Sequence, residues 1–345
     1  MKFCKKSKSW IPICALLVLA LSVGAFFLMR DAEPAPLRFA GEAKTVSTGS
    51  SHTVGLRSDG TAVAVGWWQD TGQCDLADWR DIVGVSAGSW HTVGLRSDGT
   101  AVAAGDNEFG QLNTTDWHDI VAVSAGSWHT VGLRLDGTVV ATGITSTVSN
   151  IWDVDIWDID YGQTNVNGWR DIIAVSAGMA HTVGLRSDGT VIAVGRNDSG
   201  QIYDIADWRD IVAVSAGWEH IVGLRSDGTV VSTVITGYGQ IDVSDWRDIV
   251  AVSAGRAHTV GLRSDGTVVS VKRTDWHDHD QGDVSDWRDI VAVSAGGNHT
   301  VGLITVGLRS DGTVVSTEIP DWYDHSYSDV SGWRDIKIPG AYMRQ

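Results

Sequence analysis

The 345-residue chain is poor in cysteine and proline, with three of the first and five of the second. Cys4 and Cys14 belong to an apolar N-terminal segment, so Cys74 has no partner for a disulfide within the rest of the chain. Stability must therefore come from buried apolar side chains, for which a chain of roughly 300 residues is long enough.

Positive charge is scarce beyond the N-terminus. Five of the 26 basic residues and none of the 42 acidic residues precede Asp31, so residues 31–345 hold 21 basic and 42 acidic residues, a net charge of −21. A surface this negative repels phosphate backbones, and it has no cluster of lysine and arginine. We therefore expect no nucleic acid among the partners.

Signatures of catalysis are missing as well. The chain has no phosphate-binding loop and no His-Glu-x-x-His. An enzyme on a repeat scaffold needs a nucleophile, a base and an orienting group that each occur once. We expect a protein that is not an enzyme and that uses no cofactor.

A repeat of about 39 residues occupies most of the chain. Its core reads His-x-Val-Gly-Leu and recurs with steps of 39, 38, 52, 39, 38 and 41 residues. The seven copies begin at His52, His91, His129, His181, His220, His258 and His299. The tetrapeptide Trp-Arg-Asp-Ile or Trp-His-Asp-Ile also occurs seven times, at Trp79, Trp117, Trp169, Trp208, Trp246, Trp287 and Trp333. A fixed period of this length indicates repeated supersecondary units that bury their apolar faces against their neighbours.

Each unit contains the pattern of short antiparallel strands, as the copy from Trp246 to Gly266 illustrates. Large and small residues alternate over Val250–Ser253, which predicts a first strand. His258–Arg263 predicts a second strand, with Gly261 where another backbone approaches. Asp265-Gly266 predicts a tight turn into a third strand. The remaining length leaves room for one more short strand, so each unit is a sheet of three or four strands.

Seven such sheets predict an all-β, seven-bladed β-propeller over residues 43–338, because radial packing leaves only short edges exposed. The last Trp-Arg-Asp has no unit after it, and the first unit lacks this opening. We expect Ile336 to Ile338 to close the ring near the first blade.

The repeated wording resembles a known family. Ala-Gly-x-x-His, Leu-x-x-Asp-Gly and a Gly-Gln before a Trp are similar to the regulator of chromosome condensation repeat, over about residues 43–338. The units are shorter than those of the eukaryotic nuclear protein and look more like compact bacterial members, which include a secreted inhibitor of β-lactamase. The family name implies a second function, nucleotide exchange on a small GTPase.

The N-terminus has the pattern of a membrane anchor. Lysines in the basic segment 1–9 precede the uncharged segment Trp10 to Met29, which is long enough to cross a bilayer as a helix. The lysines then stay inside and the propeller lies outside the plasma membrane, after a linker over 30–42 and before a tail over 339–345. Cleavage near Val23-Gly24-Ala25, which would release a secreted protein, is the alternative.

Metal binding is a weak possibility. The repeated histidines lie too far apart around a ring to share an ion. His277, Asp278 and His279 form the stretch with the highest density of potential ligands. We interpret it as a solvated loop and expect no metal.

Two units depart from the repeat. The third carries about thirteen extra residues after Gly143, with several Trp and Asp residues in the extended loop. The seventh repeats Thr300–Ile304 as Thr305–Arg309, so part of this stretch must bulge or loop out.

The direction of the chain separates two rims. Turns after the first and third strands lie on an upper rim, and the uniform Ser-Asp-Gly turns and Trp-Arg-Asp connections lie on a lower rim. Upper turns vary between units and are rich in Trp, a residue frequent in binding hot spots. We predict ligand binding there by Trp90, Trp128, Trp218, Arg256, Trp67, Trp68, Trp152, Trp157, Tyr238, Trp276 and Trp322. The sequence thus predicts a membrane-anchored propeller that binds an external protein or glycan.

Overall fold

The computed structural model describes residues 44–66, 71–144, 160–198, 200–233, 241–272, 283–297, 305–317 and 329–339. The chain divides into two compact units, Met1–Phe39 and Ala40–Gln345. The predicted segments 1–9, 10–29 and 30–42 lie outside the described residues. None of the helices formed by the described residues is long and apolar enough to cross a membrane.

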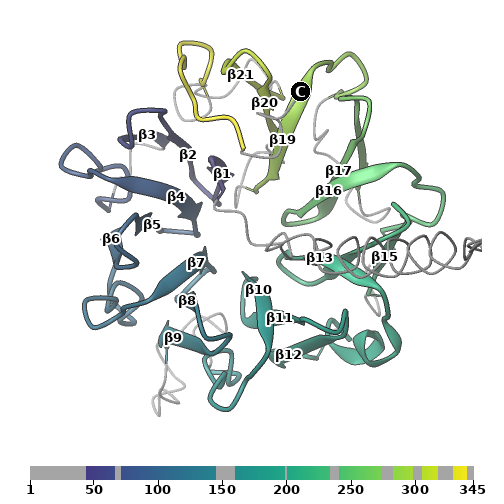
Figure 1. Ribbon diagram of the computed structural model, residues 1–345, viewed down its shortest axis with the longest axis horizontal. Helices are drawn as coiled ribbons and strands as arrows, with labels where there is room; N and C mark the ends of the chain where they lie inside the picture. Colours follow the sequence, from purple (N-terminus) through teal and green to yellow (C-terminus); the bar gives the residue numbers. More distant parts are fainter. Residues whose placement is uncertain are drawn as a thin grey trace, which may run out of the picture. The chain divides into compact units, whose positions relative to one another are not determined.

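The second unit contains seven antiparallel sheets of three strands each, among the residues described. In Figure 1 these sheets succeed one another around a common centre. Each sheet runs outward in chain order, from a first strand at the centre to a third strand at the periphery. The sheets are β1 (Val46–Thr48), β2 (His52–Leu56), β3 (Ala62–Gly66); β4 (Ile82–Ala87), β5 (His91–Arg96), β6 (Ala101–Gly105); β7 (Ile120–Ala125), β8 (His129–Arg134), β9 (Val139–Gly143); β10 (Ile172–Ala177), β11 (His181–Arg186), β12 (Val191–Gly195); β13 (Ile211–Ala216), β14 (Ile221–Arg225), β15 (Val230–Ser232); β16 (Ile249–Ala254), β17 (His258–Arg263), β18 (Val268–Lys272); and β19 (Ile290–Ala295), β20 (Thr305–Arg309), β21 (Val314–Ser316). A 3-10 helix, Tyr203–Asp207, lies between β12 and β13. The predicted seven-bladed propeller is confirmed.

The ring of blades is closed by backbone hydrogen bonds around its centre. In every blade a Gly follows the first strand, and the backbone amide of the residue after that Gly donates a hydrogen bond to the next blade. The acceptor is the carbonyl of the equivalent Gly there, over 3.2 to 3.4 Å. The seventh bond runs from the amide of Gly297 to the carbonyl of Gly49 and so joins the last blade to the first. This cycle of seven bonds fixes the number of blades.

A second cycle uses serine side chains. The Ser of the Val-Ser-Ala ending in one blade accepts a hydrogen bond from the backbone amide of the Ala in the next, for example Ala87 to Ser47 over 3.0 Å. The bond from the Thr48 amide to Ser294, over 2.9 Å, closes this cycle too. The constant spacing of Ser and Ala along the chain therefore sets the register between inner strands.

The apolar core lies between neighbouring blades. One cluster joins Val54 and Leu56 of the first blade to Trp79 and Ile82 of the second. The Trp ring lies against the mid-strand glycine: a Cβ built on Gly94 would lie 2.6 Å from the ring of Trp79. The expectation that another backbone approaches Gly261 is wrong, since its neighbour is the indole of Trp246. A Cβ built on Gly261 would lie 2.6 Å from that ring. Glycine is required there because a methyl group would occupy the space of the indole.

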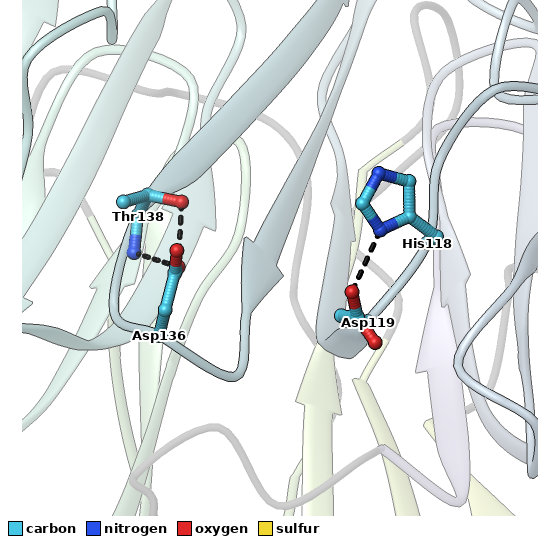
Figure 2. Close-up of polar contacts among 4 residues, drawn as sticks. All are labelled: His118, Asp119, Asp136 and Thr138. Carbon is cyan, nitrogen blue, oxygen red and sulfur yellow. Dashed lines mark hydrogen bonds and ion pairs between the residues drawn. The ribbon is translucent and has the colours of Figure 1, made fainter.

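The Asp of each Trp-Arg-Asp has a backbone role. All seven have φ between 58° and 60°, a left-handed conformation that Asp adopts more readily than most residues. Figure 2 shows the third blade, where His118 replaces the Arg and its Nδ1 lies 2.7 Å from an oxygen of Asp119. The same figure shows Asp136 accepting hydrogen bonds from the amide and hydroxyl of Thr138 in the next tight turn. These residues serve the turns of the lower rim.

The C-terminal segment completes the first blade, as predicted. Ile336 forms an antiparallel bridge with Arg57, and the amide of Lys337 donates to the carbonyl of Leu56 over 2.8 Å. Trp333 takes the place of the missing opening Trp and packs against Gly55. Trp333 and Ile336 belong to the core cluster that contains Val46 and Val306.

The duplicated stretch of the seventh unit forms its strand from the second copy. Thr305–Arg309 is β20 and pairs with β19 in the same register as the other blades. The sequence left open which of the two copies forms the second strand, and the structure uses the second copy. His299 and the first copy, Thr300–Ile304, lie outside the described residues.

Candidate functional site

The structure places the two sets of turns at opposite ends of the blades. At one end the amide of Ser97, in a tight turn, donates to the carbonyl of Asp81 in a Trp-Arg-Asp connection. At the other end the carbonyl of Trp90 accepts a hydrogen bond from the amide of Asp106, in the loop after β6. We call the second end the upper rim and the first the lower rim.

A narrow cavity opens at the centre of the upper rim, with a volume of about 70 Å³. Its wall is a ring of Ala-Gly pairs at the ends of the inner strands, with Thr48-Gly49 in the first blade. Each blade adds one residue at the entrance, the first residue after its Gly. Around the ring these entrance residues are Ser50, Ser89, Ser127, Met179, Trp218, Arg256 and Gly297. We call this cavity the mouth.

One side of the mouth is an arc of hydroxyl groups. The hydroxyls of Ser50 and Ser89 are 2.9 Å apart, and Ser89 donates to Ser127 over 2.9 Å. Ser127 ends this chain as an acceptor, which leaves its own hydrogen to point elsewhere. A chain of hydroxyls in a poorly solvated place polarises its members and strengthens the donor at its end.

The other side of the mouth is bulky and positively charged. The guanidinium of Arg256 lies over the ring of Trp218, 4.1 Å from its centre, which is the geometry of a cation–π contact. Arg256 is the one charged residue among the described residues that line the mouth. Met179 separates this pair from Ser127.

The predicted binding residues divide into two kinds. Trp218 and Arg256 follow the Gly directly and line the mouth. Trp90 and Trp128 stand one position later, are half-buried and lie outside the mouth lining. The remaining predicted residues lie outside the described part of the chain: Trp67, Trp68, Trp152, Trp157, Tyr238, Trp276, Trp322 and the metal candidates His277, Asp278 and His279.

The prediction overlooked four entrance residues. Ser50, Ser89, Ser127 and Met179 line the mouth beside the two residues that were predicted. The signal that could have found them is their position, because each is the first residue after the Gly in its turn. Tryptophan stands more often at the second position after the Gly, as Trp90 and Trp128 do, so that position was predicted instead.

The repeated histidines are structural. Thr130 donates its hydroxyl hydrogen to the carbonyl of Gln111 over 2.7 Å, so its oxygen accepts a bond from Nε2 of His91, 2.9 Å away. Nε2 of His91 therefore carries the proton. The same pair recurs between neighbouring blades as His52 and Thr92, His129 and Thr182, His220 and Thr259, and His258 and Thr305. Burial lowers the pKa of His91 to about 3 and that of His52 to about 4, which keeps both neutral.

The fourth blade breaks this pattern. Its partner in the fifth blade is Ile221 where the other units have Thr, and neither ring nitrogen of the buried His181 has a hydrogen-bond partner among the described residues. Arg196 nearby makes an ion pair with Asp198 at 2.7 Å and approaches Glu219 at 3.9 Å. Its guanidinium also lies 5.6 Å from the centre of the Tyr161 ring. The upper rim is thus most irregular between the fourth and sixth blades.

We expect the variant Thr130→Val to lose about 2 kcal/mol of unfolding free energy. Valine keeps the shape of threonine, but Nε2 of His91 is then a buried donor without an acceptor. Urea unfolding monitored by tryptophan fluorescence measures the loss. Thr115→Val, the same change at an exposed residue, should leave the unfolding midpoint in place. Equal midpoints for wild type and Thr130→Val would contradict this role for the His–Thr pair.

Within the described residues, no group of three or more His, Cys, Asp or Glu side chains is placed to hold a metal ion. The described site offers hydroxyls, an indole and a guanidinium around a narrow opening. Such groups bind a ligand by hydrogen bonds, stacking and charge. The described residues form a closed seven-bladed β-propeller with an asymmetric upper rim.

The chain carries regulator of chromosome condensation repeats. The model described as "Regulator of chromosome condensation (RCC1) repeat" matches residues 82–111, 120–146, 172–201 and 211–233, which confirms the family resemblance. A comparison with curated protein sequences gives no match.

Solved structures with this fold include ectodomains of plant receptor kinases. The CRINKLY WD40 ectodomain of ACR4 from Arabidopsis thaliana is 18% identical with a TM-score of 0.63, covering 80% of this chain and 97% of that one. The CR4 ectodomain from Physcomitrella patens is 18% identical with a TM-score of 0.58, covering 79% and 70%. Prp20p from Saccharomyces cerevisiae is 18% identical with a TM-score of 0.52, covering 80% and 83%, and its structure is described together with binding to Gsp1p and histones. At these identities the likeness is one of fold.

Proposed function

We propose that the protein is a membrane-anchored propeller that binds a protein ligand outside the cell through its upper rim, with a glycan as the alternative ligand. The observation that carries this proposal is the contrast between the two rims. Lower turns repeat the same Asp-Gly, preceded by Ser in every unit but the third, where Leu135 stands, and the same hydrogen bonds from Thr to Asp recur in blade after blade. The entrance to the mouth changes from serine hydroxyls to Met179, Trp218 and Arg256. Uniform residues build a ring, whereas varied residues can distinguish partners.

The upper rim also has the composition of a protein-binding surface. Trp90 and Trp128 are half-buried, so each leaves part of a large rigid ring exposed. Trp and Arg are the residues most enriched in binding hot spots. The plant ectodomains of similar fold are parts of receptor kinases, which is consistent with an external binding role.

Replacing Trp90, Trp128 and Trp218 together by Ala is expected to weaken ligand binding at least 100-fold, because hot-spot residues contribute about 2 kcal/mol or more each. Stability should change little, since none of the three belongs to the buried apolar core. The measurement is recovery of cell-envelope proteins by the immobilised full-length chain in detergent, followed by titration of the recovered protein.

The matched control replaces Arg80, Arg209 and Arg247 on the lower rim by Ala. Those arginines hold the carbonyls of the preceding Trp residues, and binding should survive their loss. Binding that survives the tryptophan changes instead would move the site elsewhere. A large drop in melting temperature with the three tryptophan changes would place them in the core.

The location of the propeller is a separate prediction. We expect protease added to intact cells to remove a tag at the C-terminus while residues 1–29 stay in the membrane fraction. The reason is the lysine-rich segment before Trp10 to Met29. A soluble protein that begins near Phe26 would show cleavage and contradict the anchor. Complete protection of the tag would place the propeller inside and favour the second function, nucleotide exchange on a small GTPase, which the family name implies.

A further inference from the structure

We propose that the mouth is a subsite for one carboxylate group of the ligand. This inference rests on the proposed binding function and assigns the chemistry of its centre. Three features carry it: the arrangement of Ser127 and Arg256, the size of the cavity, and the charge of the residues that line it.

Ser127 and Arg256 both line the mouth and belong to blades on opposite sides of the ring. They belong to the third and sixth blades, and three blades is the largest separation that a ring of seven allows. Ser127 ends the serine chain and has a hydroxyl hydrogen to donate into the space between. Arg256 supplies donors with positive charge from the opposite side. A carboxylate has two oxygens, so one can accept from the hydroxyl and the other from the guanidinium.

The position of Arg256 is fixed by its neighbour. Its guanidinium stacks on Trp218 at 4.1 Å, and its stem packs beside Gly297, where a Cβ would lie 2.5 Å from Cβ of Arg256. A glycine at that place leaves room for the arginine stem at the entrance. A guanidinium held in this way loses less conformational entropy on binding than a free one.

The size of the cavity fits a short acidic side chain. A volume of about 70 Å³ holds roughly five water-sized groups. The side chain of glutamate has five heavy atoms beyond its Cα. An aromatic ring, a guanidinium or a hydrated ammonium group would fit this volume less well than a short acidic side chain. The positive charge of Arg256 also repels a guanidinium or an ammonium group.

The source of the carboxylate has two forms that share this chemistry, an Asp or Glu side chain and the C-terminus of a chain. Displayed peptide libraries separate them. One library of random heptapeptides is displayed with the peptide C-terminus fused, so only side chains offer a carboxylate; a second is displayed with a free C-terminus. Both are selected against the full-length chain in detergent.

If the carboxylate comes from a side chain, we expect the wild-type protein to select peptides with Asp or Glu at one fixed position in the first library. If it comes from a C-terminus, we expect selection from the second library, with any residue at the C-terminal position. For a selected peptide, changing the acid to its amide should weaken binding at least tenfold. Arg256→Met should weaken the acidic peptide by a similar factor and should abolish the difference between acid and amide. Ser127→Ala should reduce that difference as well. Arg247→Met, an arginine of the lower rim, is the matched control and should bind like wild type.

Salt gives a second test with a distinctive sign. Residues 31–345 carry a net charge of −21, which repels an acidic peptide over distances that salt screens. Affinity for the acidic peptide should therefore hold or rise between 0.05 and roughly 0.5 M NaCl, a range over which the screening length falls from above 10 Å to a few ångström.

Other outcomes decide against the inference in different ways. Selected peptides that bind the upper rim without a fixed acid, or that fix Lys or Arg, would overturn the carboxylate subsite and leave the binding function standing. Equal weakening of the acid and amide peptides by Arg256→Met would overturn the subsite in the same way. A folded wild-type protein that selects no peptide from either library would count against both the subsite and the proposed function.

Discussion

A chain that ends at Gly332 should unfold at a much lower urea concentration than the full protein, or fail to fold. The change removes Trp333 and Ile336, which are 9% and 2% exposed and belong to the core cluster of the first blade. Loss of a buried Trp side chain costs about 3–5 kcal/mol, and loss of a buried Ile about 2–5 kcal/mol. A domain typically has about 5–15 kcal/mol in all.

The truncation also removes the backbone hydrogen bonds that the C-terminal segment makes to the first blade. The hydrogen bonds of Lys337 to Leu56 and of Ser58 to Asp335 disappear, so the edge of the first blade loses its cover. A chain that ends at Pro339 keeps every contact described for this segment and is the control. A synthetic peptide of residues 329–339 should restore part of the lost stability when added to the shorter chain. Equal urea midpoints for the two truncated chains would contradict closure by the C-terminus.

Mild acid is expected to unfold the propeller, near pH 5. Burial lowers the pKa of His52 and His181 to about 4 and that of His91, His129 and His258 to about 3, from an ordinary value of 6.5. Below pH 6.5 the unfolded chain binds protons at these residues and the folded chain does not. Unfolding then becomes more favourable as the pH falls, until the folded-state pKa values are reached.

The size of this effect follows from the number of groups. Each histidine contributes a loss of about 1.4 kcal/mol per pH unit in this window. The five together give about 7 kcal/mol per pH unit, so two units exhaust an ordinary folding stability. The exposed Asp98 acts in a different window: hydrogen bonds from Thr100 lower its pKa, so its contribution is lost only below 3.8.

The measurement is the free energy of urea unfolding at several pH values between 7 and 5. Its slope gives the number of protons bound on unfolding, which should approach five. His91→Asn should reduce that number by one. A stability that stays constant from pH 7 to pH 5 would show that the buried histidines do not titrate on unfolding.

Much of the fold could be predicted from the sequence because it depends on local pattern. The alternation in Val250–Ser253, the turn at Asp265-Gly266 and the constant repeat length each specify a strand, a turn or the number of blades. The role of Ile336 in closing the ring could also be predicted, because no unit follows the last Trp-Arg-Asp and no Trp-Arg-Asp precedes the first unit.

Other features depend on contacts that no local pattern displays. The indole of Trp246 fills the space at Gly261, fifteen positions later, and only the folded blade brings them together. The two copies Thr300–Ile304 and Thr305–Arg309 share four residues in the same order, so pattern alone could not choose between them. The second copy forms β20 because it runs directly into the tight turn at Asp311-Gly312 that pairs it with β21.

Only some of the residues that line the mouth could be predicted, for a similar reason. Variation between the units pointed to the upper rim, where the mouth lies, but the direction of each side chain depends on its place in the turn. The first residue after the Gly borders the central axis, as Ser127 does, whereas the second residue, as Trp128 does, lies outside the mouth lining. Choosing residues by aromatic content therefore found Trp218 and Arg256 and missed the serines.

The central claim is that the varied upper rim binds the ligand and the uniform lower rim only supports the ring. Hydroxyl-radical footprinting of the full-length chain, with and without a bound ligand or selected peptide, tests it most directly. We predict protection at the upper turns 88–90, 126–128, 217–219 and 255–257, strongest at Trp218, and unchanged reactivity at the lower turns 97–99, 135–137 and 226–228. Protection confined to the lower turns, with Trp218 as reactive as in the free protein, would contradict the account.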